Sequence, residues 1–160
     1  MPNNTDDLVL AIDQGTTGTT ALLLNKQVEP IASYNVEFPN HYPAPGLVEH
    51  DVEEIWNSVR DAIEGALRES GRQASEIKAI GITNQRETSL FWNKDSGTPL
   101  HRALVWQDKR TSDTCESLKA DGHEPLFQRK TGLVLDPYFS GTKAAWVLNN
   151  VDGARGLAES

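Results

Sequence analysis

The sequence predicts an α/β fold with a mixed sheet whose elements begin in the order βββαβ. Three apolar runs, at residues 8–13, 20–25 and 31–38, are separated by short turns, which is typical of an antiparallel meander. An amphipathic segment comes next, and a further apolar run, Ile77 to Ile82, follows it. A helix between two strand-like runs is the pattern of α/β proteins, so these observations together predict the fold class.

The amphipathic segment carries a start signal and a stop signal for a helix. Asp51 is a suitable N-cap residue, and Glu54 stands at the capping-box position. Apolar residues then recur at helical spacing from Ile55 to Leu67, and Gly71 is expected to end the helix. The stretch from Pro39 to Gly46, which holds three of the eight prolines, is expected to be a loop.

The second half of the chain predicts shorter elements. Ile77 to Ile82 fits a buried strand, and two further strands are expected at residues 90–92 and 103–106. A polar surface helix is predicted over residues 107–120, and Ser140 or Thr142 is expected to cap a last helix. Residues 150–155 read as a turn into a helix that the chain does not complete. With only one crossover helix before residue 107, we expect an incomplete fold: residues 1–160 as the front part of the first domain of a longer protein.

Composition excludes several classes of protein. A hydrophobic fraction of 38% argues against disorder, and a net charge of -8 disfavours nucleic acid or an anionic membrane as the main partner. The single cysteine, Cys115, excludes an internal disulfide and fits a reducing cytoplasm. The first seven residues lack the basic and apolar regions of a signal peptide and are expected to be flexible. No apolar run approaches the ~20 residues that span a membrane.

The turn between the first two predicted strands combines a carboxylate, glycines and hydroxyls, in the string Asp13 to Gly18. Backbone N–H groups and threonine hydroxyls donate to phosphate oxygens, and Asp13 can hold a hydrated cation. The string is neither a P-loop nor a Rossmann loop, because it lacks Gly-Lys-Thr and a strand follows it. An ordinary glycine hairpin is the alternative.

Arg86 and Glu87 follow the predicted strand at Ile77 to Ile82, at its C-terminal end, where ligands collect in open α/β sheets. A Glu accepts from one hydroxyl while an Arg donates to another, which suits a small polyol. A surface ion pair of little energetic value is the alternative.

Two aromatic residues stand close to polar loops further along. Trp106 ends an apolar run, and core packing is the simpler explanation for it; Tyr138, in the loop from Asp136 to Ser140, suits either a core anchor or a binding role. The four histidines show no metal-ligand spacing, and His50 is expected at the surface.

Four strings of this chain, in order, resemble those of the glycerol kinases of the FGGY carbohydrate kinase family. They are Ala11 to Thr17, Gly81 to Thr88, Val105 to Asp108, and Lys130 to Lys143. The resemblance covers nearly the whole chain, and it implies a ribonuclease H-like core of the type found in actin, hexokinase and Hsp70. The Arg86-Glu87 step and the string Asp136 to Ser140 favour glycerol kinases over pentulose kinases.

The resemblance implies ATP-dependent phosphorylation of glycerol to sn-glycerol 3-phosphate with Mg²⁺. It implies that Arg86, Glu87 and Tyr138 hydrogen-bond the glycerol hydroxyls and that Trp106 packs on the carbon side. The residues that the resemblance places at the ATP phosphates form the turn, and they are Asp13, Gln14, Gly15, Thr16 and Thr17. Asp13 is also implied to bind the metal.

The chain departs from the family in two respects. Gly18-Thr19-Thr20 stands where members often carry an Arg, and the catalytic base is expected beyond residue 160. We therefore expect no catalytic residue in this chain, no activity of the chain alone, and a homo-oligomeric full-length parent. A non-catalytic interaction module of the same fold, or a kinase for another small polyol or sugar, are the alternatives.

Overall fold

A computed structural model describes residues 7–159, so all but the last of the seven residues expected to be flexible lie outside the described part. The described chain forms two compact units. Unit 1 runs to Pro39 and resumes over Glu53–Gln85, and unit 2 comprises Asn40–Val52 and the chain from Arg86 onward. No helix among residues 7–159 is both long enough and apolar enough to cross a membrane.

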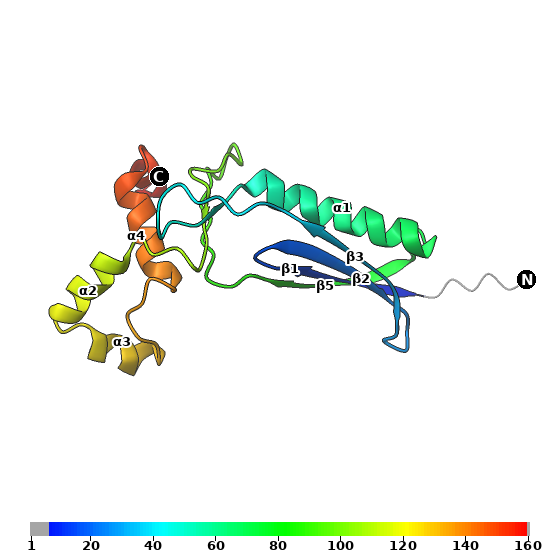
Figure 1. Cartoon of the computed structure of the whole chain (residues 1–160), viewed down its shortest axis with the longest axis horizontal. Coiled ribbons are helices and arrows are strands. Elements are labelled where there is room, and N and C mark those ends of the chain that lie inside the picture. Colours follow the sequence, from blue (N-terminus) through cyan, green and yellow to red (C-terminus); the bar gives the residue numbers. More distant parts are fainter. Residues whose placement is uncertain (1–6, 160) are drawn as a thin grey trace, which may run out of the picture. The chain divides into compact units, whose positions relative to one another are not determined.

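Unit 1 is a four-stranded mixed sheet covered on one face by a helix (Figure 1). The strands are β1 (Leu8–Gln14), β2 (Gly18–Leu24), β3 (Pro30–Glu37) and β5 (Ile77–Asn84), in the order β3-β2-β1-β5. The first three pair antiparallel, and β5 pairs parallel with β1. The helix α1 (Val52–Ser70) joins β3 to β5 by way of residues of unit 2, and a short 3-10 turn, Ala74–Glu76, precedes β5. The predicted mixed sheet and βββαβ order are confirmed.

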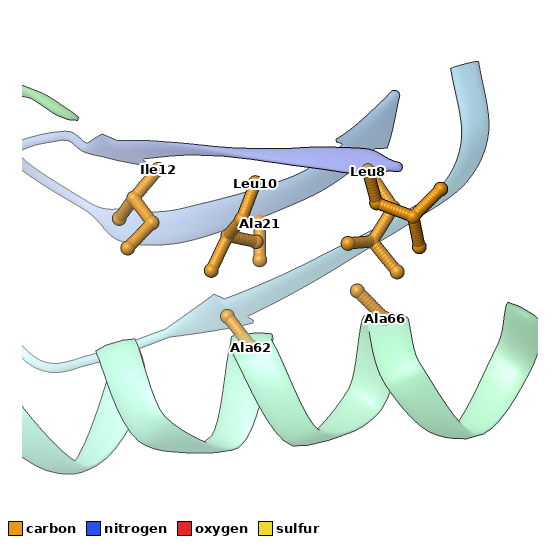
Figure 2. Packing of buried hydrophobic residues seen from close by; sticks show 7 residues of the cluster. Leu8, Leu10, Ile12, Ala21, Ala62 and Ala66 are labelled. Carbon is orange, nitrogen blue, oxygen red and sulfur yellow. The ribbon is translucent and has the colours of Figure 1, made fainter. Parts of the chain in front are cut away.

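The core of unit 1 lies between the sheet and α1. Leu8, Leu10 and Ile12 alternate along β1 with exposed or half-buried residues, because successive strand side chains point to opposite faces. Figure 2 shows these three pointing toward Ala62 and Ala66, whose small side chains bring the helix close to the strands. The helix ends as predicted at Gly71, which has a φ of 66°.

Two glycines of unit 1 are required by close packing. A Cβ on Gly18 would lie 2.8 Å from the backbone oxygen of Val36 in β3. A Cβ on Gly65 of α1 would lie 2.2–2.6 Å from ring atoms of Tyr34, also in β3. A larger residue at position 18 therefore forces β3 away from β2, whereas one at position 65 forces the Tyr34 ring to move or α1 to move away from β3.

The apolar strand β5 is an exposed edge, which corrects the prediction of a buried strand. Ile80 is 60% exposed and Ile82 is 73% exposed. The reason is topological: β5 hydrogen-bonds only to β1 among the described strands, and its first residue, Ile77, is the β5 residue that packs with the α1 core.

Unit 2 consists of short elements. A two-stranded ladder joins β4 (Glu49–His50) to β6 (Ala103–Leu104). Four helices follow: α2 (Ser112–Ala120), α3 (Glu124–Thr131), α4 (Ser140–Asn150) and α5 (Ala154–Glu159). Their core centres on Leu104, Val147 and Ala154.

Several local predictions for unit 2 are wrong. The expected strand at residues 90–92 is reduced to isolated bridges, and residues 107–111 form a turn before α2. The helix α3 was not expected, and α5 is formed although the sequence suggested an unfinished helix. His50, expected at the surface, is fully buried, and the pairing of its ring nitrogen Nε2 with Oδ1 of Asn40 at 2.5 Å compensates for the lost hydration.

Candidate functional site

The predicted phosphate loop lies in unit 1, at the turn between β1 and β2. The N–H of Gly15 donates to the carbonyl of Gly18 at 2.9 Å and closes the turn. The carbonyl of Gly15 accepts from the side-chain amides of Gln14 at 2.7 Å and Gln85 at 3.3 Å. The Phe38 N–H also donates to the carbonyl of Thr17 at 3.3 Å. The turn is therefore held by the neighbouring segments that carry Phe38 and Gln85. The side-chain amide of Gln14 also binds the turn and helps to shape it.

Asp13 lies on the open face of the sheet of unit 1. Its register partners are Thr20 on β2 and Thr83 on β5, and partners in register share a face. These three side chains line a hollow of ≈ 410 Å³ on the face opposite the α1 core, together with Ala11, Ile12, Leu22, Gly81 and Ile82. A carboxylate beside two hydroxyls is a donor set that suits a hydrated divalent cation and phosphate oxygens.

The four residues expected to contact substrate all lie in unit 2. Glu87 has a φ of 65°, which is rare for a residue other than glycine. Its oxygen Oε2 accepts from the backbone N–H of Ser140 at 2.9 Å and from the Ser140 hydroxyl at 2.6 Å. Among the described residues no donor is bonded to Oε1 of Glu87, so this oxygen is available as an acceptor.

The bonds to Ser140 give Glu87 a structural role that the sequence did not predict. The N-cap position of α4 is Phe139, whose side chain makes no cap hydrogen bond, and Ser140 is the first residue of the helix. The expected cap by Ser140 or Thr142 is therefore wrong, and the carboxylate of Glu87 takes that place. A negative charge at a helix N-terminus is stabilising, because it meets unpaired N–H groups and the positive end of the helix dipole.

Trp106 and Tyr138 are brought together. Their ring centroids are 5.8 Å apart with the planes at 66°, an edge-to-face contact. The backbone N–H of Trp106 donates to the hydroxyl of Thr88 at 3.3 Å, which links this pair to the segment carrying Glu87. Both rings line a hollow of ≈ 380 Å³ whose polar wall includes Asp108 and Asp136. Arg86 is exposed in the turn before Glu87, and no ion pair joins the two among the described side chains.

A buried ion cluster fixes the turn that carries Trp106. Asp108, only 1% exposed, accepts from the Val48 N–H at 2.7 Å and from the guanidinium of Arg110 at 2.8 and 2.9 Å. Arg110 also donates to Glu49 at 2.7 Å and lies over the ring of Trp146, 4.5 Å from its centroid. The turn is thus tied to β4 and to α4.

The charges in this cluster stabilise one another. Burial raises the pKa of Asp108, but the hydrogen bonds from Arg110 and Val48 and the charge of Arg110 outweigh that effect, so the net pKa is below its ordinary value. The pKa of Arg110 is raised in turn by Asp108 and Glu49, against the effect of burial. Both groups are therefore charged across the physiological range.

Sequence reasoning missed several residues that build this site. Asp108 belongs to the string Val105 to Asp108 that resembles the family, but nothing in the sequence indicated that Arg110 would pair with it and with Glu49. Lys143 did carry one: it falls one helical turn before Val147 on the apolar face of α4, where a charged residue is out of place. No group of three or more His, Cys, Asp or Glu side chains that could hold a metal occurs within residues 7–159.

Comparison with known proteins assigns the chain to a family. The profile of the FGGY family of carbohydrate kinases, N-terminal domain, matches residues 8–159. The glycerol kinase of Methylobacterium nodulans is 54% identical over 153 residues, which is 96% of this chain and 30% of that protein. The glycerol kinase of a Chelativorans species is 56% identical over 94% of this chain, again 30% of the relative. The chain thus spans about 30% of the length of the curated relatives it matches.

Solved structures of the same family share the fold. The crystal structure of Plasmodium falciparum glycerol kinase with ADP superposes with a TM-score of 0.87 at 28% identity, over 96% of this chain and 31% of that one. A xylulose kinase from Brucella ovis gives a TM-score of 0.82 at 29% identity, over 89% of this chain and 29% of that one. The actin- and hexokinase-like ATPase fold predicted from the sequence is therefore confirmed. On the match over residues 8–159, the chain belongs to the FGGY family of carbohydrate kinases, as an N-terminal domain.

Proposed function

We propose that this chain is the portion of an ATP-dependent glycerol kinase that binds the polyol and approaches the ATP phosphates. One observation carries the proposal most strongly: Ser140 fixes the Glu87 carboxylate through Oε2 and leaves Oε1 as an acceptor. The next residue, Thr88, accepts a hydrogen bond from the backbone N–H of Trp106. An oriented carboxylate near an aromatic pair suits a ligand with hydroxyls on one side and carbon on the other.

Each residue then has a role that follows from its chemistry. Oε1 of Glu87 accepts a hydrogen bond from one glycerol hydroxyl, and the guanidinium of Arg86 donates to another. The phenol of Tyr138 adds a neutral hydrogen bond, and the ring of Trp106 covers the carbon chain. Binding of this kind fixes which hydroxyl is presented for phosphoryl transfer, and positioning is a large part of catalysis in that reaction.

ATP with Mg²⁺ is the cofactor that unit 1 fits. Asp13, Thr20 and Thr83 line one hollow, and the adjoining turn carries the backbone N–H groups and the hydroxyls of Thr16 and Thr17. When bound, the metal would neutralise phosphate charge. Asp13 would hold the hydrated ion, while the amides of Gln14 and Gln85 keep the turn in shape.

Glycerol is preferred to a larger sugar because the curated relatives at 54–56% identity are glycerol kinases. A xylulose kinase shares the fold at a lower identity of 29%, which keeps a pentulose as the second candidate. We also place the protein in a reducing compartment, the cytoplasm, because its one cysteine, Cys115, is buried and unpaired.

A chimeric enzyme tests the proposal. In it, this chain replaces the matching 30% of the Methylobacterium nodulans glycerol kinase, and the activity of the chimera is measured with glycerol and with xylulose. We expect Glu87→Gln and Arg86→Ala each to lower kcat/KM for glycerol about 10- to 100-fold, because a hydrogen bond to a charged group is worth roughly 1.5–3 kcal/mol. ATP hydrolysis without glycerol should change much less.

Two exposed residues provide matched controls. Glu69→Gln and Arg129→Ala make the same chemical changes at exposed helical positions and should leave kcat/KM for glycerol unchanged. Loss of ATP affinity with intact glycerol affinity in the Glu87 and Arg86 variants would place these residues outside the polyol pocket. A chimera that prefers xylulose would favour the second candidate.

A further inference from the structure

Lys143 is a fully buried lysine in the first turn of α4, and two general rules oppose its position. Its exposed fraction is 0%, and a buried ammonium loses its hydration. It also lies at the N-terminal end of a helix, where the dipole and the unpaired N–H groups repel positive charge. A residue that breaks two rules at one place needs a compensating partner or a function.

The ammonium of Lys143 binds the backbone of the loop that precedes its own helix. Nζ donates to the carbonyls of Pro137 at 2.7 Å, Tyr138 at 2.5 Å and Phe139 at 3.4 Å. These are consecutive carbonyls, so the ammonium gathers them around a single point. The carboxylate of Asp136 holds the other side of the loop by accepting from the Tyr138 N–H at 2.8 Å.

The surroundings of Lys143 explain why the charge is tolerated. Burial lowers the pKa of the ammonium, and the charges of Glu87, Asp108 and Asp136 oppose this shift. Glu87 holds the N-terminus of α4 through Ser140, and Thr142 of the same turn shares a 2.9 Å hydrogen bond with Thr111. The first turn of α4 is therefore held in place by several contacts, and Lys143 connects it to the loop through its bonds to the loop carbonyls.

We propose that Lys143 is a positioning residue that fixes the Pro137–Phe139 backbone and thereby sets the Tyr138 ring against Trp106. The inference rests on the proposed function, because it concerns the residue expected to hydrogen-bond glycerol. Lys143 does not touch the substrate; it acts through the carbonyls of the loop, and its side chain needs no solvent access for that role.

The first arm of the test examines the loop in the 160-residue chain, without substrate. Lys143→Met keeps the length of the side chain and removes all of the donors; Lys143→Gln retains an amide with two donors. In ¹⁹F NMR of fluorotryptophan-labelled protein, Lys143→Met should shift the Trp106 signal, and Lys143→Gln should shift it less. The signal of Trp56, which lies on α1 in unit 1, should not move in either variant. Lys130→Met, at an exposed position of α3, is the matched control.

The second arm is a double-mutant cycle in the chimeric kinase. Tyr138→Phe removes the phenol hydroxyl and should raise the KM for glycerol about 3- to 10-fold. Lys143→Met should raise it about 10-fold or more with the KM for ATP unchanged. In the Lys143→Met background, Tyr138→Phe should raise the KM for glycerol less than about 2-fold, because the ring is no longer held in place.

The outcomes separate the inference from the proposed function. The positioning role is overturned if Tyr138→Phe raises the KM for glycerol equally in both backgrounds. It is also overturned if Lys143→Met changes neither the Trp106 signal nor the KM for glycerol. In both cases the proposed polyol pocket is unaffected. If Tyr138→Phe leaves the KM unchanged while Lys143→Met still shifts the Trp106 signal, Lys143 does hold the loop, and the assignment of Tyr138 to the polyol pocket is the part that fails.

Discussion

Replacing Gly65 by alanine tests how closely α1 packs against the sheet. A Cβ at this position would lie 2.2 Å from Cδ1, 2.3 Å from Cγ and 2.6 Å from Cε1 of Tyr34. Because Cγ is among these atoms, rotation of the ring about its own axis cannot relieve the contact. The Tyr34 side chain would have to change its first rotamer, or α1 would have to move away from β3. Arg68, whose guanidinium carbon lies 5.4 Å from the Tyr34 ring centroid, would be displaced with it.

Two opposing contributions set the magnitude. Alanine is favoured over glycine within a helix by about 1 kcal/mol. Overpacking a well-filled site costs about 1–3 kcal/mol, and contact with three ring atoms points to the upper part of that range. We therefore expect Gly65→Ala to lower the free energy of unfolding of unit 1 by about 1–2 kcal/mol net, against the direction that helix propensity alone predicts.

The assay is urea unfolding of the chain followed by ¹⁹F NMR, in which Trp56 on α1 reports on unit 1. In a Tyr34→Ala background the clash is gone, so Gly65→Ala should change sign and stabilise by up to about 1 kcal/mol. Gly156→Ala is the control, because a Cβ on Gly156 meets no atom within 4 Å. A stabilising effect of Gly65→Ala with Tyr34 in place would refute the packing argument.

The remaining prediction on unit 1 concerns Val28, a β-branched residue that is 74% exposed with a φ of 63°. Because the left-handed conformation costs such a residue about 1–2 kcal/mol, Val28→Asn should stabilise unit 1 by about 1 kcal/mol, seen as a higher urea midpoint. In unit 2, Asp108→Asn should destabilise by about 3 kcal/mol at neutral pH, because it breaks a buried pair with Arg110. The folded pKa of Asp108 is lowered, so its contribution is present above the unfolded value of about 3.9 and is lost as the pH falls through the folded pKa. Unfolding curves of both proteins should therefore converge below about pH 4, and a constant gap would contradict this.

Local patterns in the sequence were enough to predict unit 1. Strand alternation, the meander turns and the helix stop at Gly71 are all set by neighbouring residues, and all appear in the structure. The prediction that Ile80 and Ile82 would be buried was wrong, because apolar composition indicates a strand but not whether a second strand pairs with its free edge.

The candidate site was only partly accessible from the sequence. Glu87 and Tyr138 stood out through residue type and the family resemblance, and their roles remain predictions. The bond from Glu87 to Ser140 spans 53 positions, and no local pattern indicates that one carboxylate caps a distant helix. The ion pair of Arg110 with Glu49 spans 61 positions and was missed for the same reason.

Glu87 both binds the N-terminus of α4 and makes the proposed polyol contact, and this limits which residues can replace it during evolution. Glycine, asparagine or aspartate would accept a φ of 65° with less strain. However, glycine lacks a carboxylate, and the other two side chains are one methylene shorter, so none of them reproduces the bonds to Ser140 at 2.6 and 2.9 Å. A mutation here would loosen α4 at the same moment that it altered the proposed polyol contact. Under the proposed function, relatives that acquire new substrates should therefore diversify first at Arg86, which is exposed and makes no such structural bond to residues 7–159, and retain glutamate at position 87.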